Sequence, residues 1–403
     1  MATDGRSPRS ASAPAPAAAL EGTGFVHVVA RADGDALAAS GLLARALAAR
    51  GTAYQVSVAR TVADRTARIA DRELAADDAT VAIGAVDAPD IESYTRLDAD
   101  DRPATLAALE TVRELDATPD HGLALAGLVA AGVEPGAGES EWVLEAAAER
   151  GLVERRPGVA IPTDGPVDGL AHTTRLRAPW SGDVDATRDA LTTLDVALED
   201  DLETFTSDDH RAIGSLVALD AVGDDAAEPI AAETIQRALR PYATPEGPFA
   251  TIGGYADVLE ATAREEPGTG AALAMGHDAR DPALDAWREH GRRAHGALSS
   301  ASTSRYDGLF AIGIDDGPVE AVARLAAATR SPEPTVLVTA DGEAAIATRG
   351  EGALGATVEA VARELAEVGI DGVAYDGGRR RGYLRYDASV DRATIVQIVR
   401  DRR

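Results

Sequence analysis

The sequence predicts an α/β protein with a doubly wound parallel sheet, a helical connecting region and a smaller C-terminal α/β domain. Short apolar runs rich in β-branched residues alternate with helical patterns from Gly24 to about Gly132. A second alternation of this kind begins at Tyr306, and the pattern between the two is mainly helical. Such alternation favours parallel strands covered by helices, and 403 residues are enough for two domains with cores of their own.

Composition divides the chain into four parts. Residues 1–20 are mostly Ala, Pro and Ser, and we expect them to form a disordered tail. The first α/β domain is expected over 21–200, the helical connecting region over 201–303 and the C-terminal domain over 304–403. The last boundary falls in a stretch rich in Ser and Thr, Ser299–Ser304.

The individual elements follow from periodicity. Phe25–Val29 has the apolar, β-branched composition of a buried strand, and leucines recur at helical spacing from Leu37 to Leu47. The other elements expected in the first domain are strands Ala53–Val58 and Thr80–Asp87 and helices Arg60–Leu74, Pro103–Leu115 and Leu123–Ala131. Further on we expect helices Ala231–Leu239, Tyr255–Ala263, Pro282–Ala301 and Gly355–Val368, and strands Gly308–Ile314, Thr335–Val338, Ala344–Thr348 and Gly382–Tyr386.

Two aspartates, Asp33 and Asp35, lie where the first strand ends and the first helix begins. Ligands of α/β sheets gather at this carboxyl edge of the strands, and paired carboxylates can hold Mg²⁺ or Mn²⁺. The alternative is that one of the two caps the helix by accepting a backbone N–H bond. Spacing alone leaves both interpretations open.

Composition also restricts the kinds of site and partner. The net charge is −28 and all 39 basic residues are arginine, which suggests a chain kept in solution at high salt, as in halophilic archaea. In molar salt, local arginine clusters decide nucleic-acid contacts more than net charge does. The lack of cysteine excludes disulfides and thiolate sites. The longest apolar run, 122–133, is too short for a bilayer and no signal segment precedes Phe25, so we expect a cytoplasmic protein without membrane contact.

Motifs spread over the chain match one family in their order and spacing. Arg31–Ala36 carries both aspartates of a His-x-Asp-x-Asp-Gly motif, and Asp87 matches a strand-terminal aspartate. Near the C-terminus, Ala347–Gly350 is similar to a Ser-x-Arg-Gly strand and Gly377–Gly378 to a Gly-Gly-His loop. Together these stretches resemble the DHH phosphoesterase superfamily, most closely its archaeal RecJ-like branch, which includes the GINS-associated nuclease.

This resemblance implies a DHH-type N-terminal domain and a DHH-associated, nucleic-acid-binding C-terminal domain. It also implies two-metal hydrolysis, in which Mn²⁺ or Mg²⁺ ions activate water and hold the scissile phosphate. Asp33, Asp35 and Asp87 match ligand positions, but the Asp-His-His signature is missing. Arg31 stands where a metal-binding histidine is expected; a guanidinium cannot bind a metal ion, and its charge should pair with Asp33 or Asp35.

The leading hypothesis is a RecJ-like protein of DNA replication or repair whose catalytic centre has decayed. It would act by binding single-stranded DNA or the replisome proteins GINS and MCM, with Mn²⁺ or Mg²⁺ as cofactor if it keeps one. A eukaryotic branch of the superfamily, the helicase cofactor that joins MCM and GINS, works in this way. One alternative is an active Mn²⁺-dependent, single-strand-specific 5′→3′ exonuclease with ligands from Asp98, Asp100 or His121. Another is a phosphoesterase for short oligonucleotides or cyclic dinucleotides.

Candidate nucleic-acid-binding residues gather near the C-terminus. The segment Gly377–Tyr386 alternates arginine with tyrosine beside a diglycine, which suits phosphate contact and base stacking. The alternative is an edge hairpin that neutralises neighbouring acidic surface. The candidate residues are Arg349, Arg379, Arg380, Arg381 and Tyr383.

Overall fold

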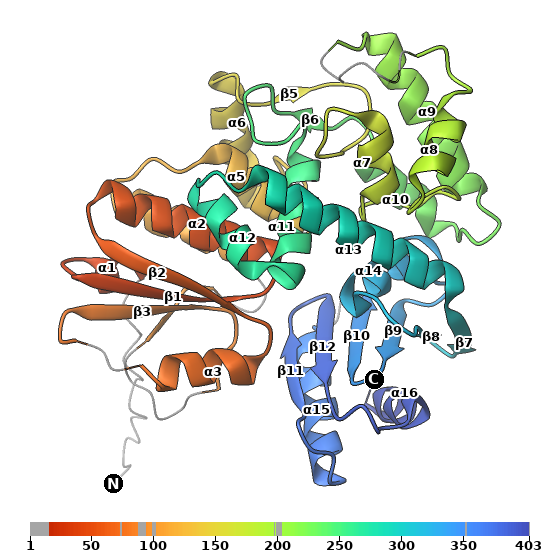
Figure 1. The fold of residues 1–403 in the computed structure, drawn as a ribbon. Helices are drawn as coiled ribbons and strands as arrows, with labels where there is room; N and C mark the ends of the chain where they lie inside the picture. Colours follow the sequence, from red (N-terminus) through yellow and green to blue (C-terminus); the bar gives the residue numbers. More distant parts are fainter. Residues whose placement is uncertain are drawn as a thin grey trace, which may run out of the picture.

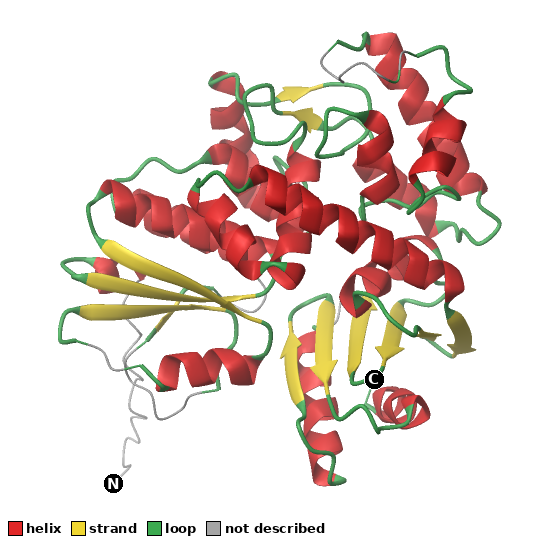
Figure 2. Cartoon of the chain, in the orientation of Figure 1, coloured by secondary structure: helices red, strands yellow, loops and turns green. Residues whose placement is uncertain are grey.

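The computed structural model describes residues 16–72, 75–87, 94–98, 102–196, 198, 204–350 and 353–402. An N-terminal α/β domain and a C-terminal α/β domain lie side by side, and a mainly helical region covers both (Figures 1 and 2). The predicted fold class is therefore confirmed. Within the described ranges, no helix combines the length and the apolar character that crossing a membrane requires.

The N-terminal sheet has four parallel strands in the order β2-β1-β3-β4. They are β1 (Phe25–Arg31), β2 (Ala53–Ala59), β3 (Asp78–Ile83) and β4 (Thr95–Arg96). The first three match expected strands, although β3 ends four residues before Asp87. The sequence missed β4, because a two-residue strand carries no periodicity.

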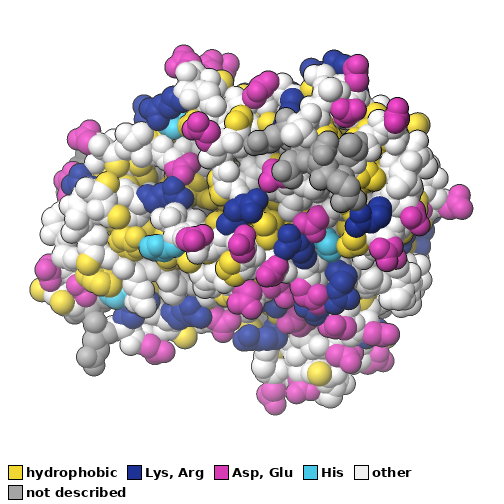
Figure 3. Space-filling view, turned by 45° about the horizontal axis from the view of Figure 1, so that its top comes forward, with side chains coloured by type: hydrophobic (Ala, Val, Ile, Leu, Met, Phe, Trp, Pro, Cys, Tyr) yellow, Lys and Arg dark blue, Asp and Glu magenta, His cyan; other side chains and the backbone are white. Residues whose placement is uncertain are grey.

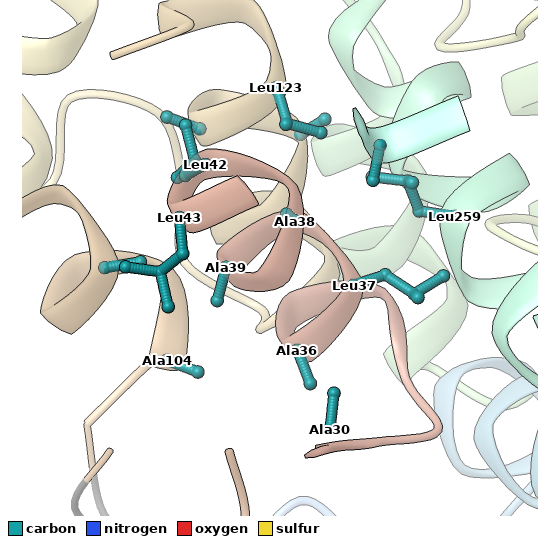
Figure 4. Packing of buried hydrophobic residues seen from close by; sticks show 14 of the residues in the cluster. Ala30, Ala36, Leu37, Ala38, Ala39, Leu42, Leu43, Ala104, Leu123 and Leu259 are labelled. Atoms are coloured by element: carbon teal, nitrogen blue, oxygen red, sulfur yellow. The ribbon is translucent and has the colours of Figure 1, made fainter. Parts of the chain in front are cut away.

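Helix α2 (Gly34–Ala49) is the centre of the N-terminal core. It is almost completely buried because alanines and leucines occupy most of its positions, so it can pack on all sides. It packs against α4 (Ala104–Glu114), α5 (His121–Ala130), α11 (Ile252–Glu265) and α12 (Pro267–Met275). Figure 4 shows the resulting contacts around Leu37, Leu42 and Leu43.

Two segments depart from the expected division of the chain. Within the expected tail, Pro16–Leu20 forms α1, whose Leu20 is buried in the N-terminal core, while residues 1–15 lie outside the described ranges. In addition, α11 and α12 come from the expected connecting region, yet their side chains belong to the same cluster of buried residues as α2. The N-terminal core is thus completed by helices more than 200 residues later in the chain.

The rest of the helical region forms a layer over both domains. Its long helix α13 (Arg280–Ser300) runs from the N-terminal core to the C-terminal domain (Figure 1). The other elements of this region are η1 (Gly138–Ser140), α6 (Glu141–Glu149), α7 (Pro166–His172), α8 (Val184–Leu191), α9 (Ser207–Gly223), α10 (Ile230–Ala238), β5 (Glu154–Arg155) and β6 (Tyr242–Ala243). Helix α3 (Val62–Ala70) belongs to the N-terminal domain and contacts β1 and β2.

The C-terminal domain is a mixed sheet in the order β11-β12-β10-β9-β8-β7, covered by helices. Helix α14 (Val319–Thr329) packs with α13 in one cluster of buried residues, and α15 (Leu354–Glu367) and α16 (Arg392–Asp401) in another. The strands are β7 (Ser302–Tyr306), β8 (Leu309–Gly313), β9 (Thr335–Ala340), β10 (Glu343–Thr348), β11 (Ala374–Gly377) and β12 (Arg381–Arg385). The hairpin β11–β12 is the part of this sheet that faces the N-terminal domain (Figure 1).

Candidate functional site

Asp33 and Asp35 are both buried at the strand-to-helix turn, and both bind helix N-termini. Asp33 caps α2, because its Oδ1 accepts the Ala36 N–H at 2.8 Å. The Asp35 carboxylate accepts the N–H of Ala104 at 2.8 Å and the N–H and Oγ1–H of Thr105 at 2.9 and 2.7 Å, so it caps the start of α4. The capping interpretation therefore holds for Asp33, and Asp35 caps a different helix from the one it belongs to.

Arg31 places its guanidinium among three buried carboxylates. It bonds to Asp33 and lies 3.7 Å from Asp35 Oδ2 and 3.6 Å from Asp98 Oδ2. Asp98 follows β4 at the same edge of the sheet, and its Oδ1 accepts the Gly84 N–H at 2.8 Å. The expected pairing of Arg31 with Asp33 is confirmed.

A second guanidinium reaches this cluster from the C-terminal domain. Arg381, the first residue of β12, contacts Asp33 Oδ2 at 2.9 Å and Glu260 Oε1 at 2.6 Å. The other oxygen of Glu260 accepts the Gly34 N–H at 2.8 Å. Gly34 is needed there, because a Cβ on it would lie 2.8 Å from the Cβ of Ala130 and 3.1 Å from Glu260. The cluster thus joins the N-terminal sheet, α11 and the C-terminal hairpin.

The network continues along the domain junction through further arginines. Arg264 lies 2.9 Å from Glu260 and 2.9 Å from Glu320, and Arg60 lies 3.2 Å from Glu320 and 3.2 Å from Glu343. Beside it, Arg65 pairs with Asp376 of β11, and Arg385 of β12 lies 3.4 Å from Asp64. Apart from Arg264–Glu260, which lies within α11, these pairs join the C-terminal domain to the rest of the chain and so hold the two together.

Burial and neighbouring charge act in opposite directions on these carboxylates. For Asp35, burial and the neighbouring Asp33 outweigh Arg31 and raise its pKa to about 6. For Asp33, burial also favours the neutral form, but Arg31 and Arg381 outweigh it and lower the pKa. The guanidinium groups of Arg264 and Arg381 likewise hold the pKa of Glu260 well below its usual range despite burial. Asp33 and Glu260 are therefore anions balanced by arginine.

The residues present do not fit the metal pair that the resemblance implies. Metal ions in such a centre need lone pairs from carboxylates and imidazoles, whereas Arg31 and Arg381 offer only N–H donors. Their charges would also repel Mn²⁺ from Asp33. No group of three or more His, Asp or Glu side chains suited to a metal ion occurs within the described ranges.

The other ligand candidates lie elsewhere or outside the described residues. Asp87 is exposed in the loop after β3, where its N–H donates to Thr66 Oγ1 at 3.0 Å, and the structure does not bring it to Arg31. Its expected place at the sheet edge is taken by Asp98. His121 is buried at the start of α5 beside Trp142, and Asp100 lies outside the described ranges.

The five candidate nucleic-acid-binding residues have different surroundings. The Arg349 guanidinium donates to the backbone carbonyls of Ala327 at 2.7 Å and Glu333 at 2.9 Å, so it holds the loop after α14. Tyr383 is only 2% exposed. Its hydroxyl donates to Glu343 at 2.8 Å and its ring lies under Arg60, which leaves no face for a base. Together with Arg381, three of the five thus serve the protein's own packing.

Arg379 and Arg380 are the two candidates that face solvent. Both lie at the tip of the β11–β12 hairpin, and neither makes an ion pair with a described residue. The hairpin thus turns Arg381 inward and its two neighbours outward.

A polar pocket of about 280 Å³ opens at the same junction. Carboxylates such as Asp315, Asp316 and Asp341 lie at its lining together with Arg60 and Arg293. On the face shown in Figure 3, arginines and carboxylates are similarly intermixed, with few broad areas of one sign. The carboxylates in the lining disfavour a phosphate backbone inside this pocket.

Sequence reasoning missed most of the network. Glu320 and Arg60 have no local pattern that marks them, and Glu260 stands out only as a departure from a family motif, because their partners are distant in sequence. The sequence indicates Asp98 only as an alternative metal ligand. The arginine in the first motif was the one sign that the cluster holds guanidinium groups.

Comparisons with known proteins give the family and the fold. The family model described as the C-terminal domain of the uncharacterized protein rrnAC1427 matches residues 301–401. The uncharacterized protein rrnAC1427 of Haloarcula marismortui is 46% identical over 408 residues, which cover 100% of both chains. The crystal structure of CDC45 from Entamoeba histolytica has a TM-score of 0.59 at 9% identity, covering 94% of this chain and 95% of that one.

The likeness to CDC45 shows that the two chains share a fold. A structure of the exonuclease RecJ bound to manganese covers 96% of this chain at 14% identity, but its TM-score of 0.44 is too low to carry weight. In contrast, the Haloarcula relative is 46% identical over the full length of both chains, which is enough to show a common family. The chain belongs to the family of the Haloarcula marismortui protein rrnAC1427.

Proposed function

We propose that this protein is a catalytically impaired, RecJ-like member of the DHH superfamily that acts by binding in DNA replication or repair in the cytoplasm. The observation that carries the proposal is the position of the Arg31 guanidinium among the carboxylates of Asp33, Asp35 and Asp98. Two-metal hydrolysis needs those oxygens to clamp cations that activate water. Asp33 and Asp35 are, on this proposal, the remnant of a metal site, with guanidinium groups in place of the ions.

The proposed ligand is single-stranded DNA, held at the tip of the β11–β12 hairpin. Support comes from Arg379 and Arg380, which are exposed cations without an ion-pair partner among the described residues. Arginine side chains contact phosphates through charge-assisted bonds. Replisome proteins such as GINS or MCM are the second class of partner, which the resemblance to the superfamily suggests.

A nuclease assay tests the loss of catalysis. Labelled single-stranded DNA is incubated with the protein and Mn²⁺ in molar KCl, and the products are compared with those of Asp33→Ala. We expect no degradation above the level of the variant. Robust 5′→3′ degradation that Asp33→Ala abolishes would contradict the proposal and favour the active exonuclease.

A binding assay tests the hairpin tip. Reversing the charge of Arg379 and Arg380 with glutamate should weaken binding of a fluorescent single strand and reduce its salt dependence, because about two phosphate contacts are lost. The matched control is Arg363→Glu on α15, which reverses an exposed arginine whose ion-pair partner among the described residues is Glu359. Equal affinity of both variants would count against this face.

A further inference from the structure

The guanidinium of Arg175 has no ion-pair partner among the described residues. It follows α7, is half-buried, and its guanidinium makes no hydrogen bond or ion pair with a described residue. It lies over the first turn of α11, where a Cβ built on Gly253 would be 3.7 Å from Arg175 Nε. A half-buried cation without a counter-charge is costly, so its position calls for an explanation.

A second arginine, Arg324, approaches from the C-terminal domain. Its Nη2 donates to Thr174 Oγ1 at 2.6 Å, next to Arg175 in the chain, and its side chain is 34% exposed. The nearest carboxylate, Asp257 Oδ1, is 4.0 Å away. Arg324 therefore brings further positive charge to Arg175 without a close ion pair of its own.

Asp257 and Glu260, the described carboxylates whose charges act on Arg175, already have partners. Asp257 is completely buried and accepts bonds from the hydroxyl of Thr173, the N–H and hydroxyl of Thr174, and Trp287 Nε1, all within 2.6–2.9 Å. Glu260 binds Gly34, Arg264 and Arg381, as described above. Neither has an oxygen left to neutralise both Arg175 and Arg324.

The electrostatic balance agrees with this geometry. Burial, together with the charges of Arg324 and Arg237, lowers the pKa of Arg175, although Asp257 and Glu260 act in the opposite direction. Two guanidinium groups offer ten N–H donors in planar forks between them, and such forks match the oxygens of phosphate. The oxygens of a phosphate group would supply the negative charge that these two guanidinium groups lack.

We infer that Arg175 and Arg324 form an oxyanion site that takes a phosphate group between the helical region and the C-terminal domain. The site does not depend on the proposed function, because it can take either the phosphate of a small compound or the backbone phosphate of a single strand. It is also separate from the hairpin tip with Arg379 and Arg380.

Calorimetry with pyrophosphate, at fixed KCl concentration, tests the site. We expect Arg175→Gln and Arg324→Gln each to weaken binding about tenfold or more, the loss typical of a charge-assisted hydrogen bond. Arg68→Gln is the matched control, since Arg68 is an exposed arginine on α3 without an ion pair to a described residue. Its affinity should equal that of the wild type.

Thermal unfolding in phosphate-free KCl separates binding from packing. Arg175→Gln should leave the unfolding midpoint unchanged or raise it, because it removes an uncompensated cation. Pyrophosphate affinity that is equal in Arg175→Gln and wild type, or absent in both, would overturn the inference. So would a midpoint lowered by several degrees in Arg175→Gln.

A single-stranded oligonucleotide, titrated in the same way, distinguishes the two sources of phosphate. If Arg175→Gln weakens both ligands, the site takes backbone phosphate. If it weakens pyrophosphate alone, the site takes a small phosphate compound. The nuclease assay and the hairpin-tip variants do not involve Arg175 or Arg324. The proposed function can therefore hold even if this inference fails.

Discussion

Replacing Arg31 with alanine should destabilise the N-terminal domain strongly. The change leaves the carboxylates of Asp33, Asp35 and Asp98 close together, each less than 10% exposed and without the cation between them. Removing one partner of a buried ion pair typically costs about 3–5 kcal/mol. For a domain of this size, that corresponds to a fall of about 10 °C in the unfolding midpoint.

The stability lost in Arg31→Ala should increase as the pH rises. Burial already raises the pKa of Asp35 to about 6, and Arg31 opposes that shift. Without Arg31, the folded-state pKa of this carboxyl rises further above its unfolded value. The folded variant then holds more protons than the unfolded chain in this range, so its stability falls as pH rises. The cost of Arg31→Ala should therefore be larger at pH 8 than at pH 5.5.

Divalent cations provide the decisive comparison for this variant. The vacated cluster offers carboxylate oxygens, which Mn²⁺ accepts, so Mn²⁺ should raise the unfolding midpoint of Arg31→Ala. The wild type should not respond. Arg363→Ala, which breaks an exposed i,i+4 pair, should cost less than about 0.5 kcal/mol. A similar small loss for Arg31→Ala, or equal Mn²⁺ stabilisation of wild type and variant, would refute the reasoning.

Three further predictions concern Arg381, His295 and Tyr383. Arg381→Ala removes bonds from the C-terminal hairpin to two buried carboxylates and should lower stability by about 3 kcal/mol, whereas Arg380→Ala next to it should change the denaturation midpoint hardly at all. Burial lowers the pKa of His295 to about 4, against an ordinary value of 6.5. Because the unfolded chain then binds the proton more readily, the free energy of unfolding should fall by about 3 kcal/mol as the pH drops from 6.5 to 4. The variant His295→Asn should lose this pH dependence, whereas His277→Asn, at an exposed histidine, should keep it. Tyr383→Leu, which removes the aromatic ring, should leave single-strand affinity by fluorescence anisotropy unchanged because the ring is buried, and a marked loss in a folded variant would show that bases stack on it.

Strong local patterns allowed much of the fold to be predicted. The β-branched run at Phe25 and the leucines of α2 carry their own periodicity, and Pro282–Ala301 matches α13 within two residues. The elements that were missed have weak patterns. β4 has two residues, and α14 is buried over most of its length, so its sequence lacks a wide polar face.

The candidate site was predictable only where it is local in sequence. Arg31, Asp33 and Asp35 lie within five residues, so their interaction follows from one turn. Glu260 and Arg381 meet across 121 residues, and only the docking of two domains brings them together.

The order of the family motifs also led to the wrong carboxylate, Asp87, at the carboxyl edge of the sheet. Asp87 is the last residue of a predicted strand, but β3 ends at Ile83 and the chain leaves the edge before reaching it. Asp98 reaches the edge because β4 pairs in parallel with β3. The prediction for Tyr383 depended on tertiary structure too. Its aromatic ring could stack on a base, but Arg60 covers it.

The most direct test of the guanidinium-filled centre is the amount of Mn²⁺ bound at equilibrium in molar KCl. High salt screens the acidic surface, so the difference between wild type and Asp33→Ala reports the centre alone. We expect the two proteins to bind the same small amount of Mn²⁺. Two Mn²⁺ ions per wild-type chain that Asp33→Ala loses would contradict the account.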